Sequence, residues 1–200
     1  AIREIKILQQ MDHGNIVKMI EILMAPPPDK DVYIVFDYLE HDLSGLMKSS
    51  VGTVVLRDDL HGIIIKGIMY QLLQGLQYLH EQVHVIHRDM KGSNILIDKY
   101  GRVKLADFGL ARLLSAVDQD DSVSIVNNSN ILPVMTNRVI TLWFRPPEVL
   151  LGSDTYGPEV DMWGLGCIFA ELFLEKAAFT GSDEISQLEA ILIGLSCEQS

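Results

Sequence analysis

The hydrophobic pattern of the first part of the chain predicts a helix followed by a pair of strands. Residues 1–11 repeat apolar side chains at every third position, as expected for one face of a helix. The apolar runs at 16–24 and 32–36 are typical of strands, and the three prolines at 26–28 predict the turn between them. The predicted helical face consists of Ile2, Ile5 and Leu8.

Longer patterns lie in the middle and last parts of the chain. Residues 60–82 carry an apolar stripe with helical spacing, and residues 158–174 are apolar on nearly all sides, which predicts a buried helix. Residues 115–130 are rich in Ser, Asp and Asn without a sustained apolar period, so we expect a mobile loop there. The stripe consists of Ile64, Ile68, Leu72, Leu76 and Leu79, and short strands are expected near 85–86, 95–97 and 103–105.

The composition is that of an ordinary globular domain. With 48% hydrophobic and 22% charged residues, 200 residues suffice for one sizeable core. The net charge of −11 argues against a general nucleic-acid-binding role, whose footprint is basic, and is compatible with basic protein partners. Cys167 and Cys197 lie far apart without metal-ligand or disulfide spacing, which favours a reducing compartment.

The ends of the chain predict a fragment of a longer protein. The sequence begins at Ala1 without a methionine, within a predicted helix, and ends at Ser200. It carries no basic-then-apolar signal segment, and no apolar run reaches the ~18 residues that suggest a membrane span. We therefore expect no membrane partner.

Residues with catalytic potential concentrate in HRDMKGSN at 87–94 and in Asp107-Phe108-Gly109. An isolated Asp-Phe-Gly is most simply a turn between strands, but its order and spacing after HRDMKGSN resemble the catalytic and metal loops of eukaryotic protein kinases. Phosphoryl transfer depends on positioning and charge neutralisation more than on covalent help from the protein. It needs a carboxylate that accepts the proton of the attacking hydroxyl, oxygen ligands for magnesium, and a cation near the transferred phosphate.

The resemblance implies a role for each of these side chains. Asp89 is expected to be the catalytic base and Lys91 to contact the γ-phosphate. Asn94 and Asp107 are expected to hold Mg²⁺, with ATP as the phosphate donor. Asp161, in the segment DMWGLG, is expected to anchor the backbone of the catalytic loop, because a buried carboxylate needs such partners.

The resemblance also implies a nucleotide pocket. Phe36-Asp37-Tyr38-Leu39 closes a strand where kinases have the hinge between their lobes, so the backbone of Asp37 and Leu39 is expected to meet the adenine edge. Glu4 is expected to pair with the ATP-site lysine of the family, but neither that lysine nor the glycine-rich loop occurs in this sequence. The truncated chain alone is therefore expected to be inactive. The remaining implied nucleotide contacts, each an ordinary residue when taken singly, are Phe36, Asp42, Leu96 and Ala106.

Other segments resemble cyclin-dependent kinases in particular. The segment AIREI at the start of the chain is similar to the end of their cyclin-contacting helix. Arg3 in this segment is either a surface residue or, with Arg88 and Arg112, part of a phosphate clamp, a task that suits guanidinium groups. Thr136, in MTNRVITLWFRPPE, stands at the position of the activating threonine, so we expect it to be phosphorylated.

The segments TNRVITLWFRPPE, GSNILI and YGPEVDMWG are most similar to transcriptional cyclin-dependent kinases, notably the catalytic subunits of fungal kinases for the RNA polymerase II C-terminal domain. Val139 and Ile140 lie where that family forms the pocket for the proline after the target serine or threonine. Thr141 matches a threonine that helps to hold the base and Lys91. Residues 113–133 depart from the pattern, as either a lineage-specific insertion or a gene-model artefact.

The implied fold is α+β, a bilobal protein-kinase fold. Residues 1–38 would form a partial N-lobe with the cyclin-contacting helix and the following strands, and residues 39–200 most of the mainly helical C-lobe. The implied function is that of a nuclear, cyclin-activated, proline-directed serine/threonine kinase acting on the RNA polymerase II C-terminal repeat domain in transcription elongation, without direct contact to nucleic acid. A cell-cycle kinase and an inactive fragment or scaffold remain alternatives.

Overall fold

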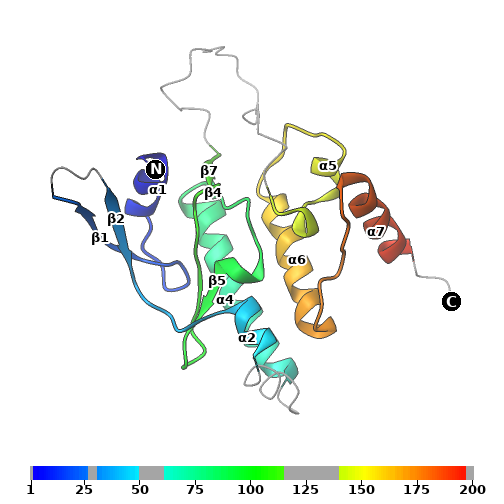
Figure 1. The fold of residues 1–200 in the computed structure, drawn as a ribbon, viewed down its shortest axis with the longest axis horizontal. Coiled ribbons are helices and arrows are strands. Elements are labelled where there is room, and N and C mark those ends of the chain that lie inside the picture. The colour runs from blue at the N-terminus through cyan, green and yellow to red at the C-terminus, as the bar shows by residue number, and fades with distance from the viewer. Residues whose placement is uncertain (1, 27–30, 50–60, 115–139, 197–200) are drawn as a thin grey trace. The chain divides into compact units, whose positions relative to one another are not determined.

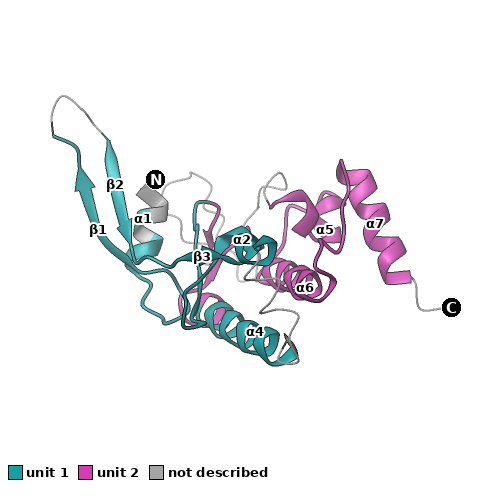
Figure 2. Cartoon of the chain, turned by 60° about the horizontal axis from the view of Figure 1, so that its bottom comes forward, with its two compact units in different colours: residues 1–78, 92–109 teal, residues 79–91, 110–200 magenta. Residues whose placement is uncertain are grey.

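The computed structural model describes residues 2–26, 31–49, 61–114 and 140–196, which form two compact units (Figure 2). Unit 1 comprises residues 1–78 and 92–109, and unit 2 comprises residues 79–91 and 110–200. The chain passes between the units after Tyr78, after Lys91 within HRDMKGSN, and after Gly109 at the end of Asp107-Phe108-Gly109. These units do not coincide with the lobes expected at 1–38 and 39–200, and that lobe boundary stays a prediction.

The elements of each unit follow the chain order (Figure 1). Unit 1 contains α1 (Ile2–Gln9), β1 (Met19–Met24), β2 (Val32–Phe36), β3 (His41–Asp42), α2 (Leu43–Lys48), α4 (His61–Gln77), the 3₁₀ turn η2 (Gly92–Asn94), β5 (Ile95–Ile97) and β6 (Val103–Leu105). The π-helical turn η1 (Tyr78–Gln82) continues α4 across the boundary between the units. Unit 2 contains β4 (Val85–Ile86), β7 (Arg112–Leu113), the 3₁₀ turn η3 (Leu142–Phe144), α5 (Pro147–Leu150), α6 (Glu159–Leu174) and α7 (Glu184–Ser196).

Within the described residues, the apolar pattern predicted α1, α4 with η1, α6 and the strands β1, β2, β4, β5 and β6, whereas it did not predict α2, α5, α7, β3 or β7. The strand expected at 16–24 is shorter, because Ile16 makes only an isolated bridge to Leu105 before β1 begins at Met19. Among the side chains of α1 that the structure describes, Ile7 and Leu8 are buried and Ile5 is half-buried, whereas the side chain of Ile2 lies outside the described part. Of the stripe expected in α4 and η1, Ile64 is half-buried, and the buried members are Ile68, Leu72, Leu76 and Leu79.

Two small antiparallel sheets organise unit 1. Strands β1 and β2 form a hairpin, and β5 lies between β3 and β6 in a three-stranded sheet. The edge of β6 is closed by side chains, since Asn15 Nδ2 donates to the carbonyl of Val103 at 2.8 Å and Gln71 Oε1 accepts from its N–H at 2.9 Å. These contacts satisfy backbone groups that an unpaired strand edge would leave open.

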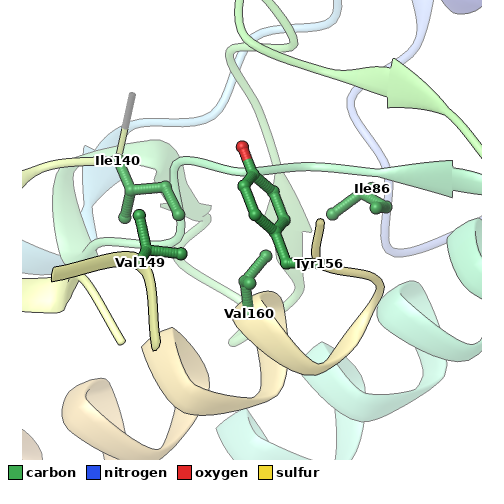
Figure 3. Packing of buried hydrophobic residues seen from close by; sticks show 5 residues of the cluster. All are labelled: Ile86, Ile140, Val149, Tyr156 and Val160. Carbon is green, nitrogen blue, oxygen red and sulfur yellow. The ribbon is translucent and has the colours of Figure 1, made fainter. Parts of the chain in front are cut away.

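An apolar cluster forms part of the core of unit 2. The ring of Tyr156 lies between Ile86 on one side and Ile140 and Val149 on the other, with Val160 of α6 below it (Figure 3). All five residues of this cluster are at most 6% exposed. The cluster therefore joins β4, which precedes HRDMKGSN, to the segment that follows residue 139.

Helix α6 is buried along one face and exposed along the other, so the expectation of a buried helix holds for one face only. Ile168 and Leu172 are buried, but Phe169 and Phe173 on the opposite face are 44% and 51% exposed. A nearly uniform apolar sequence gives no period that separates an inner from an outer face. The buried face includes Cys167. Burial, together with the nearby charge of Glu171, raises the pKa of the Cys167 thiol to about 12.

Some of the sequence-based predictions fall on residues that the structure does not describe. The loop expected at 115–130, most of segment 113–133, part of the proline turn, and Cys197 all lie outside the described residues. Within the described residues, none of the helices has the length and apolarity needed to cross a membrane.

Candidate active site

The side chains of Asp89, Lys91 and Thr141 meet in unit 2. Thr141 Oγ1 donates to Asp89 Oδ1 at 2.8 Å, and Lys91 Nζ contacts Asp89 Oδ2 at 2.6 Å. Lys91 Nζ also lies 3.3 Å from Thr141 Oγ1, which closes a triangle. Asp89 is buried, whereas Thr141 is exposed. A carboxylate oriented by a hydroxyl and an ammonium group can position another hydroxyl and take its proton.

The backbone at the start of HRDMKGSN is held by Asp161, as expected from the resemblance. Asp161 Oδ1 accepts from the N–H of Arg88 and Oδ2 from the N–H of His87, each at 2.8 Å. His80 Nε2 lies 2.8 Å from the same Oδ2. Asp161 is 1% exposed, and Arg88 has φ 67°, which is uncommon for a residue with a side chain. The buried carboxylate therefore finds partners and at the same time stabilises a strained turn.

Asn94 and Asp107, the expected metal ligands, both lie in unit 1. The carbonyl of Asn94 accepts from the N–H of Ala106 at 2.9 Å, which fixes the residue before Asp107. Asp107 is exposed with φ 61°, and Phe108 beside it is 1% exposed. An amide oxygen and a carboxylate are hard oxygen donors, so this donor set fits Mg²⁺ that phosphate oxygens help to coordinate. The described residues contain no cluster of three or more His, Cys, Asp or Glu side chains suited to a metal on their own.

The expected hinge segment is held by the side chain of Asp37. Asp37 Oδ1 accepts from the N–H of Lys18 at 2.8 Å, and Oδ2 forms a hydrogen-bonded ion pair with Lys104 Nζ of β6. The N–H of Asp37 in turn donates to the carbonyl of Lys18 at 3.0 Å. Because its N–H is used in this way, the carbonyl of Asp37 is the backbone group of this residue that could meet a nucleotide base.

The other expected nucleotide contacts also lie in unit 1. Phe36 ends β2 and Leu39 is buried. Asp42 caps the N-terminus of α2, where Oδ1 accepts from the N–H of Gly45 at 2.8 Å, and its backbone pairs with Leu96 in the sheet. Leu96 and Ala106 are half-buried. Glu4 lies within α1, but its side chain is outside the described part of the structure.

The arginines of the expected phosphate clamp are described only in part. Arg88 is 4% exposed and donates through Nε to the carbonyl of Leu110 at 2.6 Å and through Nη1 to Tyr156 Oη at 3.3 Å. Arg112 is half-buried in β7 and pairs with Ile86, two residues before Arg88. The side chain of Arg3 and the whole of Thr136 lie outside the described residues, so the clamp stays a prediction.

Ile140, expected at the proline pocket, has an unusual backbone. Its φ is 70°, its side chain is buried in the apolar cluster, and its carbonyl accepts from Arg145 Nε at 3.3 Å and Nη2 at 3.0 Å. A β-branched residue in the left-handed region is strained unless its surroundings hold it there. Val139, its expected partner in the pocket, lies outside the described residues.

Three contributors to these sites were not assigned a role from the sequence: Lys104, Arg145 and His80. Lys104 and His80 each contact a residue 67 or more positions away, and Arg145 contacts a backbone carbonyl five positions away. Lys104 could have been flagged as a charged residue in the middle of an apolar strand. Arg145 could have been flagged as a charge between an aromatic residue and two prolines, but no spacing rule names its partner.

Comparisons with known proteins agree with the motifs. The protein kinase domain family matches residues 1–198. The chain is 47% identical over 205 residues to cyclin-dependent kinase C-2 of Oryza sativa subsp. japonica, covering 96% of this chain and 36% of that protein. It is 45% identical over 191 residues to the CTD kinase subunit alpha of Saccharomyces cerevisiae, covering 96% of this chain and 32% of that protein.

A solved structure shows the same fold. The chain resembles one in the crystal structure of the yeast RNA Pol II CTD kinase CTDK-1 complex, with a TM-score of 0.78 and 46% identity. The match covers 96% of this chain and 55% of that chain. The chain spans about a third of the length of the two curated relatives. The resemblance to cyclin-dependent kinases is thereby confirmed, and the chain belongs to the protein kinase family, with part of its α+β fold.

Proposed function

We propose that this chain is part of a cyclin-dependent, proline-directed serine/threonine kinase that transfers the γ-phosphate of ATP to protein hydroxyls. The triangle of Asp89, Lys91 and Thr141 carries this proposal, because it presents a buried, oriented carboxylate beside an ammonium group. An inactive scaffold would need none of these contacts for docking alone.

The three side chains divide the work of phosphoryl transfer. Asp89 orients the attacking hydroxyl of the substrate and accepts its proton. Thr141 holds one oxygen of that carboxylate in place, and Lys91 offsets negative charge on the transferred phosphate. The anchoring of the loop by Asp161 keeps the base in position without a reorganisation cost during the reaction.

Asn94 and Asp107 are the proposed magnesium ligands. These two side chains would hold Mg²⁺, which when bound would supply charge neutralisation for the phosphate groups of the nucleotide. The backbone carbonyl of Asp37 and the backbone of Leu39 are proposed to read the adenine edge. Phe36, Leu96 and Ala106 would line the pocket, and Asp42, which retains a second carboxylate oxygen beyond its cap contact, would face the ribose.

The geometry of Ile140 supports selectivity for proline after the phosphorylated residue. Its carbonyl already accepts two N–H groups of Arg145. A substrate residue that brings a backbone N–H to this surface would leave it unpaired, at a cost of about 1–3 kcal/mol. Proline has no N–H and avoids that cost.

The substrate and the partner are proposed from the relatives. Two of the similar proteins carry CTD kinase in their names, so we infer the RNA polymerase II C-terminal repeat domain as substrate, a cyclin as regulatory subunit, and the nucleus as location. Phosphorylation of Thr136 would add about −1.5 to −2 charge and create a ligand for Arg3, Arg88 and Arg112. Glu4 would complete the nucleotide site with a lysine from outside this chain.

The test compares the complete parent protein, bound to its cyclin, with its Asp89→Asn variant on a polymerase heptad-repeat peptide and a histone-type peptide. Asparagine is nearly isosteric but cannot act as base, so kcat should fall by roughly 10²–10⁴-fold while nucleotide binding persists. The control is Asp154→Asn, which changes an exposed carboxylate without a hydrogen bond to any described residue. Wild-type kcat in Asp89→Asn would refute the assignment, no activity in the unaltered protein would favour a scaffold, and preference for the histone-type peptide would favour a cell-cycle kinase.

A further inference from the structure

The strained backbone of Ile140 depends on one arginine. The apolar cluster buries the side chain of Ile140. A backbone with a φ of 70° persists only where the surroundings hold it, so the carbonyl of Ile140 also needs a partner. Arg145 supplies this through two N–H groups, Nε and Nη2. Whatever orients the guanidinium of Arg145 therefore controls the direction of the Ile140 carbonyl.

Glu184, the first residue of α7, pairs with the remaining arm of this guanidinium. Arg145 Nη1 donates to Glu184 Oε1 at 2.7 Å. The side chain of Arg145 is 11% exposed, whereas that of Glu184 is 60% exposed. A largely buried guanidinium needs compensation for its charge, and Glu184 is the carboxylate that supplies it among the described residues. The two contacts on opposite arms fix both the position and the plane of the fork.

Helix α7 holds Glu184 in place through its first turn. Asp183 Oδ1 accepts from the N–H of Ser186 at 2.9 Å and so caps the helix. Gln187 is fully buried, accepts from the N–H of Gly181 at 2.6 Å and donates to the carbonyl of Trp143 at 3.3 Å. Trp143 Nε1 in turn donates to the carbonyl of Gly181 at 3.0 Å. These bonds tie the start of α7 to η3, two residues before Arg145.

We propose that Glu184 is a positioning residue for substrate selectivity, which acts through Arg145 on the carbonyl of Ile140. With Glu184 in place, the carbonyl is occupied and a residue with an N–H after the phosphoacceptor is disfavoured. Without it, the guanidinium can turn to solvent, and the carbonyl of Ile140 becomes available to accept a substrate N–H. This inference rests on the proposed proline-directed activity and assigns its selectivity to a helix 44 residues along the chain from Ile140.

The experiment measures kcat/KM of the complete, cyclin-bound protein for two peptides that differ only by proline or alanine after the target serine. Glu184→Gln should lower the Ser-Pro to Ser-Ala ratio about threefold to tenfold, because the pair is half in solvent and contributes modestly. Glu184→Ala should lower it at least as far, since it removes the acceptor altogether. The matched control is Glu189→Gln, an exposed carboxylate of the same helix with no hydrogen bond or ion pair to a described residue.

The ratio separates the possible outcomes. A fall confined to the two Glu184 variants supports the inference. General damage to folding or catalysis would lower both peptides equally and leave the ratio unchanged, which would overturn the inference. An equal fall in Glu189→Gln would also overturn it, because the effect would then come from the charge of the helix. An unaltered protein that phosphorylates both peptides but does not prefer proline would instead refute the proline-directed part of the proposed function.

Discussion

Asp161 and Arg88 are joined by a 2.8 Å hydrogen bond from the backbone N–H of Arg88 to Oδ1 of a carboxylate that is 1% exposed. The same carboxylate takes the N–H of His87 through its other oxygen. Two consecutive donors of the catalytic loop thus share one acceptor group from α6. The turn that places Asp89 depends on both oxygens of Asp161 being acceptors.

Replacement of Asp161 by asparagine should therefore destabilise the protein. The amide has one oxygen, so either His87 or Arg88 would face an NH₂ group and leave a buried donor unpaired, at a cost of about 1–3 kcal/mol. The free energy of unfolding, measured by urea titration of the complete protein, should fall by that amount in Asp161→Asn. Asp154→Asn, at an exposed position before α6, should leave it nearly unchanged. Equal stability of the two variants would show that the shared acceptor is dispensable.

Asp98, in the turn between β5 and β6, is expected to make a pH-dependent contribution to the free energy of unfolding. Burial acts to raise the pKa of Asp98, but hydrogen bonds from Arg102 and Tyr100, with the charge of Arg102, outweigh it and lower the pKa below its ordinary value. A group with a depressed folded-state pKa stabilises the fold above its unfolded-state pKa of about 3.9, and this contribution is lost as the pH falls through the folded-state value.

Asp98→Asn should accordingly lower the free energy of unfolding at pH 7, and its deficit relative to the unaltered protein should shrink as the pH falls below about 4. Urea titrations at a series of pH values, with Asp154→Asn as the control, would measure this difference. A deficit that is the same at every pH would mean that Asp98 contributes through its shape and not through its charge.

Local patterns predicted the parts of the site that depend on neighbouring residues. The apolar periods identified α1, α4, α6 and five of the strands but not α7, and the spacing of HRDMKGSN and Asp107-Phe108-Gly109 selected the residues of the expected catalytic and metal loops. The contact of Thr141 with Asp89 was expected from the resemblance, and the structure contains it. The roles of these residues remain proposals.

Contacts between distant segments could not be read in this way. Nothing in the sequence pairs Arg145 with Glu184 or Asp37 with Lys104, because these pairs are 39 and 67 positions apart and follow no helical or strand period. The exposed face of α6 was missed for a related reason, since Phe169 is as apolar as the buried Ile168 beside it. Tertiary packing determines which distant residues pair and which face of a helix is buried, and local sequence propensity carries no information about it.

The ion pair between Asp37 and Lys104 gives a prediction about nucleotide binding. The side chain of Asp37 is 28% exposed and that of Lys104 19% exposed, so the pair is partly shielded from solvent. Because the backbone of Asp37 is proposed to contact the adenine edge, loss of the pair should weaken nucleotide binding more than it disturbs the catalytic loop. Lys104→Met should then raise KM for ATP by roughly threefold to tenfold with little change in kcat, since such pairs contribute about 1 kcal/mol.

A charge exchange tests whether the pair itself is responsible. Asp37→Lys and Lys104→Asp should each raise KM for ATP, because each places two like charges side by side, and the double variant should recover part of the loss. KM for the peptide substrate, measured in the same assays, serves as the internal control and should stay constant. If the two substitutions damaged independent sites, their effects on KM would add, so recovery in the double variant indicates a direct interaction between the two side chains. Additive losses would show that Asp37 acts through its bond to the N–H of Lys18, which the exchange also removes, and not through Lys104.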